Sequence, residues 1–301
     1  MKSFVMGIDF GSTTTKTVIL DLQGKMVASC VASKGSISAE GMQASMDGAL
    51  AQAGIGKADI RRAVSTGYGR RMIDIADQSY TEITCHARGA HAMFPDAQLV
   101  IDIGGQDSKV IALGAGGLVA QFAMNDRCAA GTGKFLEALA RAVQVPIEDM
   151  GAMALAADEK LTISNMCATF AETEVISLLA EGKPKTDVLG AVHAAIASRT
   201  AGLVARIGKR EPAVMTGGVA KNPAAVRFIE QALGFSLLIP PDPQLAGALG
   251  AALFALDEVS STRGDEEDRV DGAIEAARGC ATQPCRTPAA AGESPLRGPL
   301  R

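Results

Sequence analysis

Two segments of the sequence combine an aspartate, glycines, hydroxyl side chains and a lysine. Residues 8–16 read IDFGSTTTK, and residues 101–109 read IDIGGQDSK. The interval that separates Asp9 from Asp102 also separates the first glycines and the lysines of the two segments. A glycine-rich turn lets the backbone approach a ligand closely, and its N–H groups can form a concave anion site. The chemistry that this pattern favours is the binding of a polyphosphate.

The apolar residues around each segment predict a β-hairpin. An apolar run precedes each aspartate and another follows each lysine, which is the pattern of a strand, a tight turn and a second strand. Either copy alone would be interpreted as an ordinary hairpin with glycines for positive φ. Two copies in phase indicate a duplicated unit with two ligand-binding turns.

The two turns supply the predicted phosphate ligands, which are Gly11, Ser12, Thr13, Thr14, Lys16, Gly104, Gly105 and Gln106. Asp9 cannot face a phosphate favourably. We expect it to hold a hydrated Mg²⁺, because this ion keeps most of its waters and needs only one or two carboxylates.

Other nucleotide motifs do not fit the sequence. Residues 129–135, AAGTGKF, resemble the end of a P-loop, but Cys128 stands where that motif needs glycine, and Phe135 where it needs serine or threonine. No G-x-G-x-x-G follows a predicted strand into a helix, so a dinucleotide-binding Rossmann site is not expected.

The composition is that of a globular protein and excludes several function classes. Of 301 residues, 48% are hydrophobic and 21% are charged. Aromatic residues make up 4% and the net charge is −4, which argues against a nucleic-acid partner. The longest apolar stretch, residues 245–256, is too short to cross a bilayer. With no export signal, the six cysteines are expected as thiols in a reducing cytoplasm.

Short predicted hairpins alternate with helical patterns, which indicates an α/β protein with mixed sheets. Helices are expected at residues 42–53, 134–144, 169–181 and 187–208. We expect a first lobe at 1–96 joined by a returning helix at 244–258, a second lobe at 97–243, and a tail at 259–301. The tail has an acidic run and almost no large apolar residues, so we expect it to be disordered.

Two cysteines stand out by their positions. Cys128 and Cys167 each lie just before a predicted helix, where the helix dipole favours a thiolate. Thr169 and Glu172 match a T-x-x-E capping box at the second of these helices. An iron–sulfur cluster usually takes four thiolates. This chain offers two in this context, so a twofold dimer would supply four.

The remaining cysteines and two histidines have simpler interpretations. Cys30 and Cys85 are interpreted as core residues, because cysteine is among the most buried residue types. His86 and His91 lie near Cys85 in the sequence, but a helix-surface or core position is expected for both. Cys280 and Cys285 have C-x₄-C spacing within the expected tail, which is a weak metal signal.

Three motifs resemble the phosphate and adenosine motifs of the actin, hexokinase and heat-shock-chaperone ATPase superfamily: GIDFGSTTTK, VIDIGGQDSK and MTGGVAKNP. Four others resemble, more narrowly, activators of 2-hydroxyacyl-CoA dehydratases and ATPase subunits of benzoyl-CoA reductase: STGYGR, NDRCAAGTGKFLE, ISNMCATFAETE and PPDPQLAGALGAAL. The resemblance runs from about Met6 to Leu256.

The resemblance implies a two-lobed actin-like ATPase fold with duplicated lobes around a nucleotide cleft. It implies ATP or ADP with Mg²⁺, and one iron–sulfur cluster, of the 4Fe–4S type, shared across a homodimer or a dimer with a related subunit. A ferredoxin or flavodoxin would donate an electron to the cluster. ATP hydrolysis would drive that electron onto an acyl-CoA dehydratase or benzoyl-CoA reductase partner.

The resemblance also implies roles for single residues. Gln106 is a candidate for orienting the attacking water, and Asp9 and Asp102 would hold Mg²⁺. Cys128 and Cys167 would be the cluster ligands. The residues expected at the adenosine are Gly217, Gly218, Asn222, Gln244 and, beside the adenine, Pro241.

Two other functions fit part of the pattern. A small-molecule kinase of the same superfamily would explain the ATP motifs, but it would leave the two cysteine segments without a role. A non-enzymatic ATP sensor or assembly protein is the third possibility. Brown colour with iron and sulfide in anaerobically purified protein would exclude most kinases and sensors.

Overall fold

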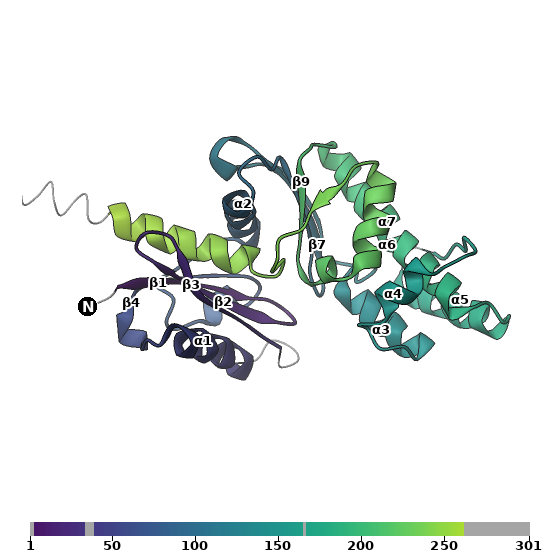
Figure 1. Cartoon of the computed structure of the whole chain (residues 1–301), viewed down its shortest axis with the longest axis horizontal. Helices are drawn as coiled ribbons and strands as arrows, with labels where there is room; N and C mark the ends of the chain where they lie inside the picture. Colours follow the sequence, from purple (N-terminus) through teal and green to yellow (C-terminus); the bar gives the residue numbers. More distant parts are fainter. Residues whose placement is uncertain (1–2, 34–38, 165–166, 262–301) are drawn as a thin grey trace, which may run out of the picture. The chain divides into compact units, whose positions relative to one another are not determined.

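The computed structural model describes residues 3–33, 39–164 and 167–261 of the chain. The described part contains two five-stranded sheets with helices packed on their faces (Figure 1). Most of the tail expected at 259–301 lies outside the described residues, while 259–261 continue a helix that covers 246–261.

The first sheet is built around the N-terminal hairpin. Strands β1 (Phe4–Phe10) and β2 (Thr15–Asp21) pair antiparallel, with Asp9 opposite Lys16. The sheet has the order β3-β2-β1-β4-β5 and is completed by β3 (Met26–Ala32), β4 (Ile60–Thr66) and β5 (Gln78–Ser79). Because β1 runs parallel to β4, the sheet is mixed, as predicted.

The second sheet repeats this plan. Strands β6 (Leu99–Ile103) and β7 (Ser108–Leu113) pair antiparallel, with Asp102 opposite Lys109. The order is β10-β9-β6-β7-β8, with β8 (Val119–Asn125), β9 (Ala213–Thr216) and β10 (Leu237–Leu238). Here β6 runs parallel to β9, just as β1 runs parallel to β4. The predicted hairpins and their duplication are therefore confirmed.

The alternation of side chains along a strand decides which helix each aspartate meets. In β1, the even-numbered residues pack with α1 (Ala39–Ala53), whereas Val5 packs with the helix at 246–261. Asp9 shares the parity of Val5 and lies on that same face. In β6, Val100 packs against α2 (Glu82–Met93), and Asp102, two residues further along the strand, lies on the same face.

The helices after the second hairpin share one core with the second sheet. They are α3 (Gly133–Val143), α4 (Met150–Leu155), α5 (Ala168–Ala180), α6 (Lys185–Ile207) and α7 (Pro223–Leu233). The helices predicted at 134–144, 169–181 and 187–208 are present within two residues of their expected bounds, α1 begins three residues earlier, and the returning helix ends three residues later than expected. The six residues of α4 give too short a periodic pattern to be predicted.

One of these helices, α6, is long and apolar enough to span a membrane by length and composition alone. Its 18-residue window has a mean hydropathy of 1.4, but 61% of that window is buried inside the fold. That burial is typical of the core helix of a globular domain, so its apolar character is explained by packing.

The helix α2 was not among the helices located from the sequence, and it contacts the cores of both sheets. Ala87 and Ala90 of α2 pack with Val100 and Ile111 of the second sheet, whereas Cys85 packs in the core of the first sheet. The helix at 246–261 packs on the first sheet with Val18 and Val64. The expected lobe boundaries stay a prediction.

The helix at 246–261 touches both β1 and α2 with backbone against backbone. A Cβ added at Gly7 would lie 2.1 Å from the carbonyl oxygen of Ala248. A Cβ at Gly89 would lie 1.9 Å from that of Ala246, and one at Gly250 would lie 1.9 Å from that of Cys85. Glycine is required at these three positions because no side chain fits between the two backbone segments.

We expect Gly250→Ala to lower the free energy of unfolding by about 1–3 kcal/mol, because overpacking forces the backbones apart. The matched control is Gly202→Ala in α6, where a Cβ would meet nothing within 4 Å. That change should raise stability by about 0.5–1 kcal/mol, because alanine favours the helix. Urea denaturation of both variants measures the difference, and equal effects would contradict the close packing.

Candidate nucleotide site and cysteine segments

A cavity of about 480 Å³ lies between the two glycine turns. The first turn lines it with Gly11, Ser12, Thr13, Thr14 and Lys16, and the second with Gly104 and Gly105. Each turn is closed in the same way, since Gly11 N donates to Thr14 O at 3.2 Å and Gly104 N donates to Asp107 O at 2.9 Å. The structure therefore brings the predicted phosphate ligands to one cavity, with the exception of Gln106.

The two turns face each other closely. A Cβ added at Gly105 would lie 2.1 Å from Thr13 Oγ1, so only glycine lets the second turn approach the first. The buried Thr13 hydroxyl has no hydrogen-bond partner among the described residues. A buried hydroxyl without a partner is costly, and an anion in the cavity would satisfy it.

Asp9 is buried at the end of β1 with one oxygen left over. Its Oδ2 accepts a hydrogen bond from Lys16 Nζ at 3.0 Å, whereas Oδ1 has no partner within the described part of the chain. Gly67 and Gly247 lie against this carboxylate. A Cβ added at Gly67 would lie 2.5 Å from Oδ1, and one added at Gly247 would lie 3.1 Å from Oδ2. A buried carboxylate with an open oxygen fits a hydrated Mg²⁺.

Asp102 is equally buried, but both of its carboxylate oxygens have partners. Thr216 Oγ1 donates to Oδ1 at 2.8 Å, and Lys109 Nζ donates to Oδ2 at 3.2 Å. His86 Nδ1 lies 3.3 Å from Oδ1. Burial alone would raise the pKa of Asp102, but His86 and Lys109 hold it well below its usual range. The expected magnesium role therefore fits Asp9 better than Asp102, because the ammonium group of Lys109 already neutralises the charge of Asp102.

Lys109 is a fully buried cation held by three carboxylates. Its Nζ lies 2.8 Å from Glu82 Oε1, 2.8 Å from Asp107 Oδ2 and 3.2 Å from Asp102 Oδ2. Burial would lower the pKa of Lys109, but the three acids, Asp102 foremost, raise it well above its ordinary value. A buried charge of this kind is stable only when it is paired and hydrogen-bonded.

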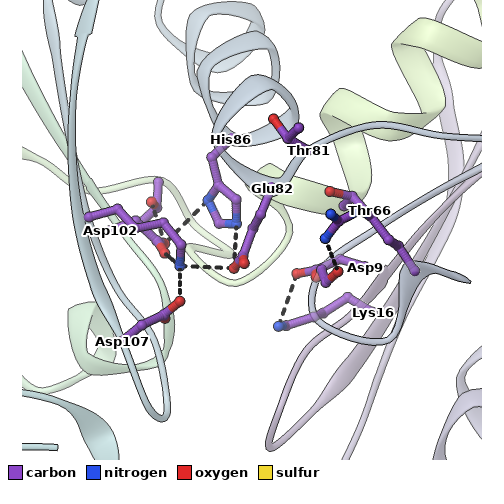
Figure 2. Close-up of polar contacts among 12 residues, drawn as sticks. Asp9, Lys16, Thr66, Thr81, Glu82, His86, Asp102 and Asp107 are labelled. Carbon is purple, nitrogen blue, oxygen red and sulfur yellow. Dashed lines mark hydrogen bonds and ion pairs between the residues drawn. The ribbon is translucent and has the colours of Figure 1, made fainter. Parts of the chain in front are cut away.

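Glu82 and His86 reach the cavity from the first turns of α2 (Figure 2). The helix begins at Glu82 because Thr81 caps it and accepts a hydrogen bond from Thr84 N. His86 is buried on α2, as the expected core position requires, but it also lies between Glu82 and Asp102 in the cavity wall. A signal was present in the sequence, because Glu82 and His86 have i, i+4 spacing.

Glu82, His86 and Asp102 could offer three metal-ligand atoms within 4.8 Å of one another. The ammonium of Lys109 already lies among the two carboxylates, so these residues do not need a further cation. Burial raises the pKa of Glu82, and Lys109 opposes that effect. A carboxylate with a raised pKa in a cavity can accept a proton at neutral pH.

The expected adenosine residues Gly217, Gly218, Asn222 and Gln244 line the same cavity. Gly217 has φ +88°, and a Cβ there would lie 2.3 Å from Ile103 O. Asn222 also caps α7, because its Oδ1 accepts from Ala224 N at 3.0 Å. The sequence did not single out Glu137, Ile147 or Lys221, which also line the cavity.

Two predicted site residues lie away from the cavity. Gln106 and Pro241 are exposed, and neither lines its wall. Gln106 sits at the tip of the second turn, where the neighbouring Asp107 points inward to Lys109 instead. The proposed water-orienting role of Gln106 and the adenine contact of Pro241 gain no support from these positions.

Cys128 lies in the loop that joins β8 to α3. The N-cap of α3 is Thr132, so the thiol precedes the helix start by several residues and does not occupy it as expected. Asn125 Nδ2 donates to Cys128 O at 2.9 Å and fixes the loop to the end of β8. The side chain is half-buried and packs against the core of the second sheet.

The second glycine turn is bonded directly to the start of α3. Gly133 N donates to Gly104 O at 2.9 Å, and Lys134 N donates to Gly105 O at 2.8 Å. Two of the N–H groups that a helix start leaves unpaired are thus satisfied by the turn. A displacement of this turn is therefore passed to α3 and to the loop that carries Cys128.

Cys167 is itself the N-cap of α5. The predicted capping box of Thr169 and Glu172 is wrong, because both residues lie inside the first turns of the helix. The backbone N–H groups of Thr169 and Phe170 lower the pKa of the Cys167 thiol, and Arg199 adds a smaller effect in the same direction. A thiol in this position favours the thiolate, the form that binds metal.

The other cysteines match their simpler interpretation where they are described. Cys85 is buried in the core under the first sheet, and burial raises its pKa to about 12. Cys30 is half-buried on β3 against Gly48 of α1. His91 is half-buried and packs on Gly117. Cys280 and Cys285 lie outside the described residues.

Comparison with known proteins places this geometry in a family. The model of the BadF/BadG/BcrA/BcrD ATPase family matches residues 6–255. The chain belongs to this family. The family membership and the two-lobed fold expected from the motifs are thus confirmed.

Individual members of the family are similar over nearly their whole length. An activator of lactoyl-CoA dehydratase from Anaerotignum propionicum is 44% identical over 84% of this chain and 98% of its own length. One of the subunits of benzoyl-CoA reductase from Thauera aromatica is 31% identical over 82% of this chain and 91% of its own. The solved activator of the 2-hydroxyisocaproyl-CoA dehydratase from Clostridium difficile, with bound ADPNP, has a TM-score of 0.83 and 40% identity and covers 87% of this chain and 97% of its own.

The two aspartates should respond differently to the same substitution. Asp9→Asn should lower Mg²⁺-dependent ATP hydrolysis by about 10–100-fold, as outer-shell metal ligands do. Asp102→Asn should instead lower the free energy of unfolding by about 1–3 kcal/mol, because it weakens a buried ion-pair network. Magnesium titrations of hydrolysis and urea denaturation separate the two effects. Equal loss of stability in both variants would contradict the assignment of the open oxygen to Asp9.

The two described thiols with shifted pKa values should react differently with iodoacetamide in the reduced, metal-free protein. The lowered pKa of Cys167 keeps its thiolate populated at pH values below the ordinary thiol pKa of about 8.5, and it is lost only as the pH falls further. Cys85, with a pKa of about 12, should stay unmodified until the protein unfolds. Peptide mass spectrometry over pH 6–9 measures both rates, and faster modification of Cys85 in folded protein would refute this order.

Proposed function

We propose that the protein is a cytoplasmic ATPase that drives single-electron transfer to a partner acyl-CoA enzyme. The partner would be a 2-hydroxyacyl-CoA dehydratase or a benzoyl-CoA reductase, the two classes named for the relatives above. The observation that carries the proposal is the pair of hydrogen bonds from Gly133 and Lys134 to the second glycine turn. They connect a phosphate-binding turn to the helix that follows Cys128.

The nucleotide half of the proposal is supported by the cavity. The backbone N–H groups of both turns, the Thr13 hydroxyl and Lys16 would hold the phosphates of ATP. Asp9 would hold the magnesium ion through water, and the bound ion would neutralise charge on the transferred phosphoryl group. Glu82 lines the cavity and has a raised pKa, so it is better placed than Gln106 to receive a proton from the attacking water.

The redox half rests on the two cysteine segments. Cys128 and Cys167 would be ligands of one iron–sulfur cluster, which when bound carries the single electron. Both thiols are half-buried, and the lowered pKa of Cys167 suits a thiolate ligand. The helix α5 exposes Phe170 and Ile176, at 67% and 53% of their surface. A second copy of this chain, or a related subunit, would cover these side chains and bring the other two thiolates.

A movement caused by ATP hydrolysis would be transmitted to the loop of Cys128 through the polypeptide chain. When the terminal phosphate leaves, the N–H groups of the second turn lose their anion, and the turn can move. Its carbonyl groups hold the start of α3, so the movement is transmitted to the loop of Cys128. A ferredoxin or flavodoxin would supply the electron before this step.

Anaerobic purification with variants of each thiol tests the proposal. The full-length protein should be brown and contain iron and sulfide. Cys128→Ser and Cys167→Ser should each abolish the cluster, because each removes two of four thiolates from a homodimer. Both variants should still bind ATP, because the cavity is built from other residues, but neither should activate the partner enzyme.

The matched control is Cys30→Ser, which changes a half-buried thiol on the first sheet and should keep full iron. A Cys128→Ser or Cys167→Ser protein with full iron would refute the cluster assignment. Colourless wild-type protein that phosphorylates a small molecule would favour the kinase instead.

A further inference from the structure

A second cavity lies beside the loop of Cys128 and shares no lining residue with the nucleotide cavity. Its volume is about 220 Å³. Arg199 and Arg206 of α6 form one side, and Asn125 of β8 with Ala130 and Gly131 of the cysteine loop form the other. The nucleotide site does not use this cavity.

The wall of the cavity is tied to Cys128 by hydrogen bonds. Asn125 Nδ2 donates to Cys128 O at 2.9 Å, and Ser108 Oγ donates to Gly131 O at 3.2 Å. Gly131 has φ +86°, and a Cβ there would lie 3.2 Å from Arg199 Cδ, so the arginine stem lies across the loop backbone. A group that binds in this cavity therefore binds next to the cysteine loop.

The cavity is basic although the chain is acidic overall, with a net charge of −4. Arg206 is exposed and makes no ion pair with a carboxylate of the described residues. Arg127, next to Cys128, is exposed as well, and the adjacent Asp126 does not line the cavity.

Two guanidinium groups at one cavity match the planar carboxylate better than any other common anion on a protein surface. A carrier that delivers one electron and leaves again needs a small, charged contact that forms fast and dissociates fast. An acidic carrier fits this requirement, because attraction between opposite charges speeds its approach to the cysteine loop.

We propose that this basic cavity receives a carboxylate side chain of an acidic one-electron carrier protein and so docks the carrier beside the cluster site. The proposal rests on the proposed function, because it takes Cys128 as a cluster ligand. In the step that follows docking, the reduced carrier loses one electron and the cluster gains it, and no covalent bond forms or breaks.

The test replaces Arg206 and measures binding without any cluster. An acidic flavodoxin is titrated into full-length, cluster-free protein at several salt concentrations. Arg206→Glu should weaken binding at least about tenfold at low salt, with a smaller effect at high salt, because the interaction is charge-driven. Arg206→Lys should fall between this variant and the wild type, because lysine keeps the charge but loses the planar fork.

The matched control is Arg227→Glu, which makes the same change of charge at an exposed arginine of α7. It should bind the flavodoxin as the wild type does. In loaded protein, reduction of the cluster by reduced flavodoxin should slow in Arg206→Glu but not in Arg227→Glu. Reduction by dithionite, iron content and ATP hydrolysis should be equal in all variants.

Three outcomes would overturn the proposal. Wild-type binding and reduction rates in Arg206→Glu would show that the cavity does not dock the carrier. Loss of the dimer in Arg206→Glu would assign the cavity to contact between copies. Impaired activation of the acyl-CoA partner with normal carrier kinetics would assign it to that partner. A wild-type protein that never contains iron would refute the proposed function, and the flavodoxin titration would still decide the docking.

Discussion

The buried ammonium of Lys109 is the interaction on which the site depends. It joins three parts of the chain, because its carboxylate partners come from β6, from the second glycine turn and from the first residue of α2. None of the four charges is stable in this position without the others. Pairing them fixes the turn relative to α2, and His86 adds a further contact from that helix to Asp102. The second half of the nucleotide site is therefore organised before any ligand arrives.

Duplication produced two similar hairpins whose ion pairs differ in number. In the first copy, Asp9 is the one carboxylate among the described residues that pairs with Lys16, and Asp9 Oδ1 has no hydrogen-bond partner there. In the second copy, the lysine has three acidic partners and the aspartate is saturated. The helix on each aspartate face contributes to the difference, since α2 brings Glu82 and His86 toward Asp102, whereas Gly247 of the helix at 246–261 lies against Asp9. The second copy therefore pairs its aspartate fully within the chain, and the first copy does not.

The sequence predicted features that depend on local pattern. Alternating apolar runs around each glycine turn were sufficient for the hairpins, and their equal spacing for the duplication. The phosphate turns could be assigned because their ligands are neighbours in the chain. Glu82 and His86 had only their i, i+4 spacing as a local signal, because their partners Lys109 and Asp102 lie far along the chain on strands β7 and β6. The roles of Gln106 and Pro241 stay predictions, because a position on a turn does not determine which way its side chain points, and both residues lie exposed outside the cavity wall.

The cysteine segments show the same limit at finer scale. Sequence pattern placed both thiols near helices, yet Cys167 caps α5 itself and Cys128 lies before the cap of α3. The T-x-x-E pattern was misleading because the helix starts two residues earlier than the motif suggests. Helix ends depend on which local group satisfies the first N–H groups, and here the second glycine turn does so for α3.

The glycine contacts of the helix at 246–261 have a mechanical consequence. Where Gly7, Gly89 and Gly250 meet carbonyl groups, no side chains interdigitate between the elements. Surfaces that interlock through side chains must change rotamers before they can shift, so they tend to jump between discrete arrangements. At these three crossings the backbones themselves are in contact, while side chains of the same helix pack with Val5 and Val18 of the first sheet. A shift of the helix is therefore transmitted directly to β1 and α2, with no side chain between them to absorb it.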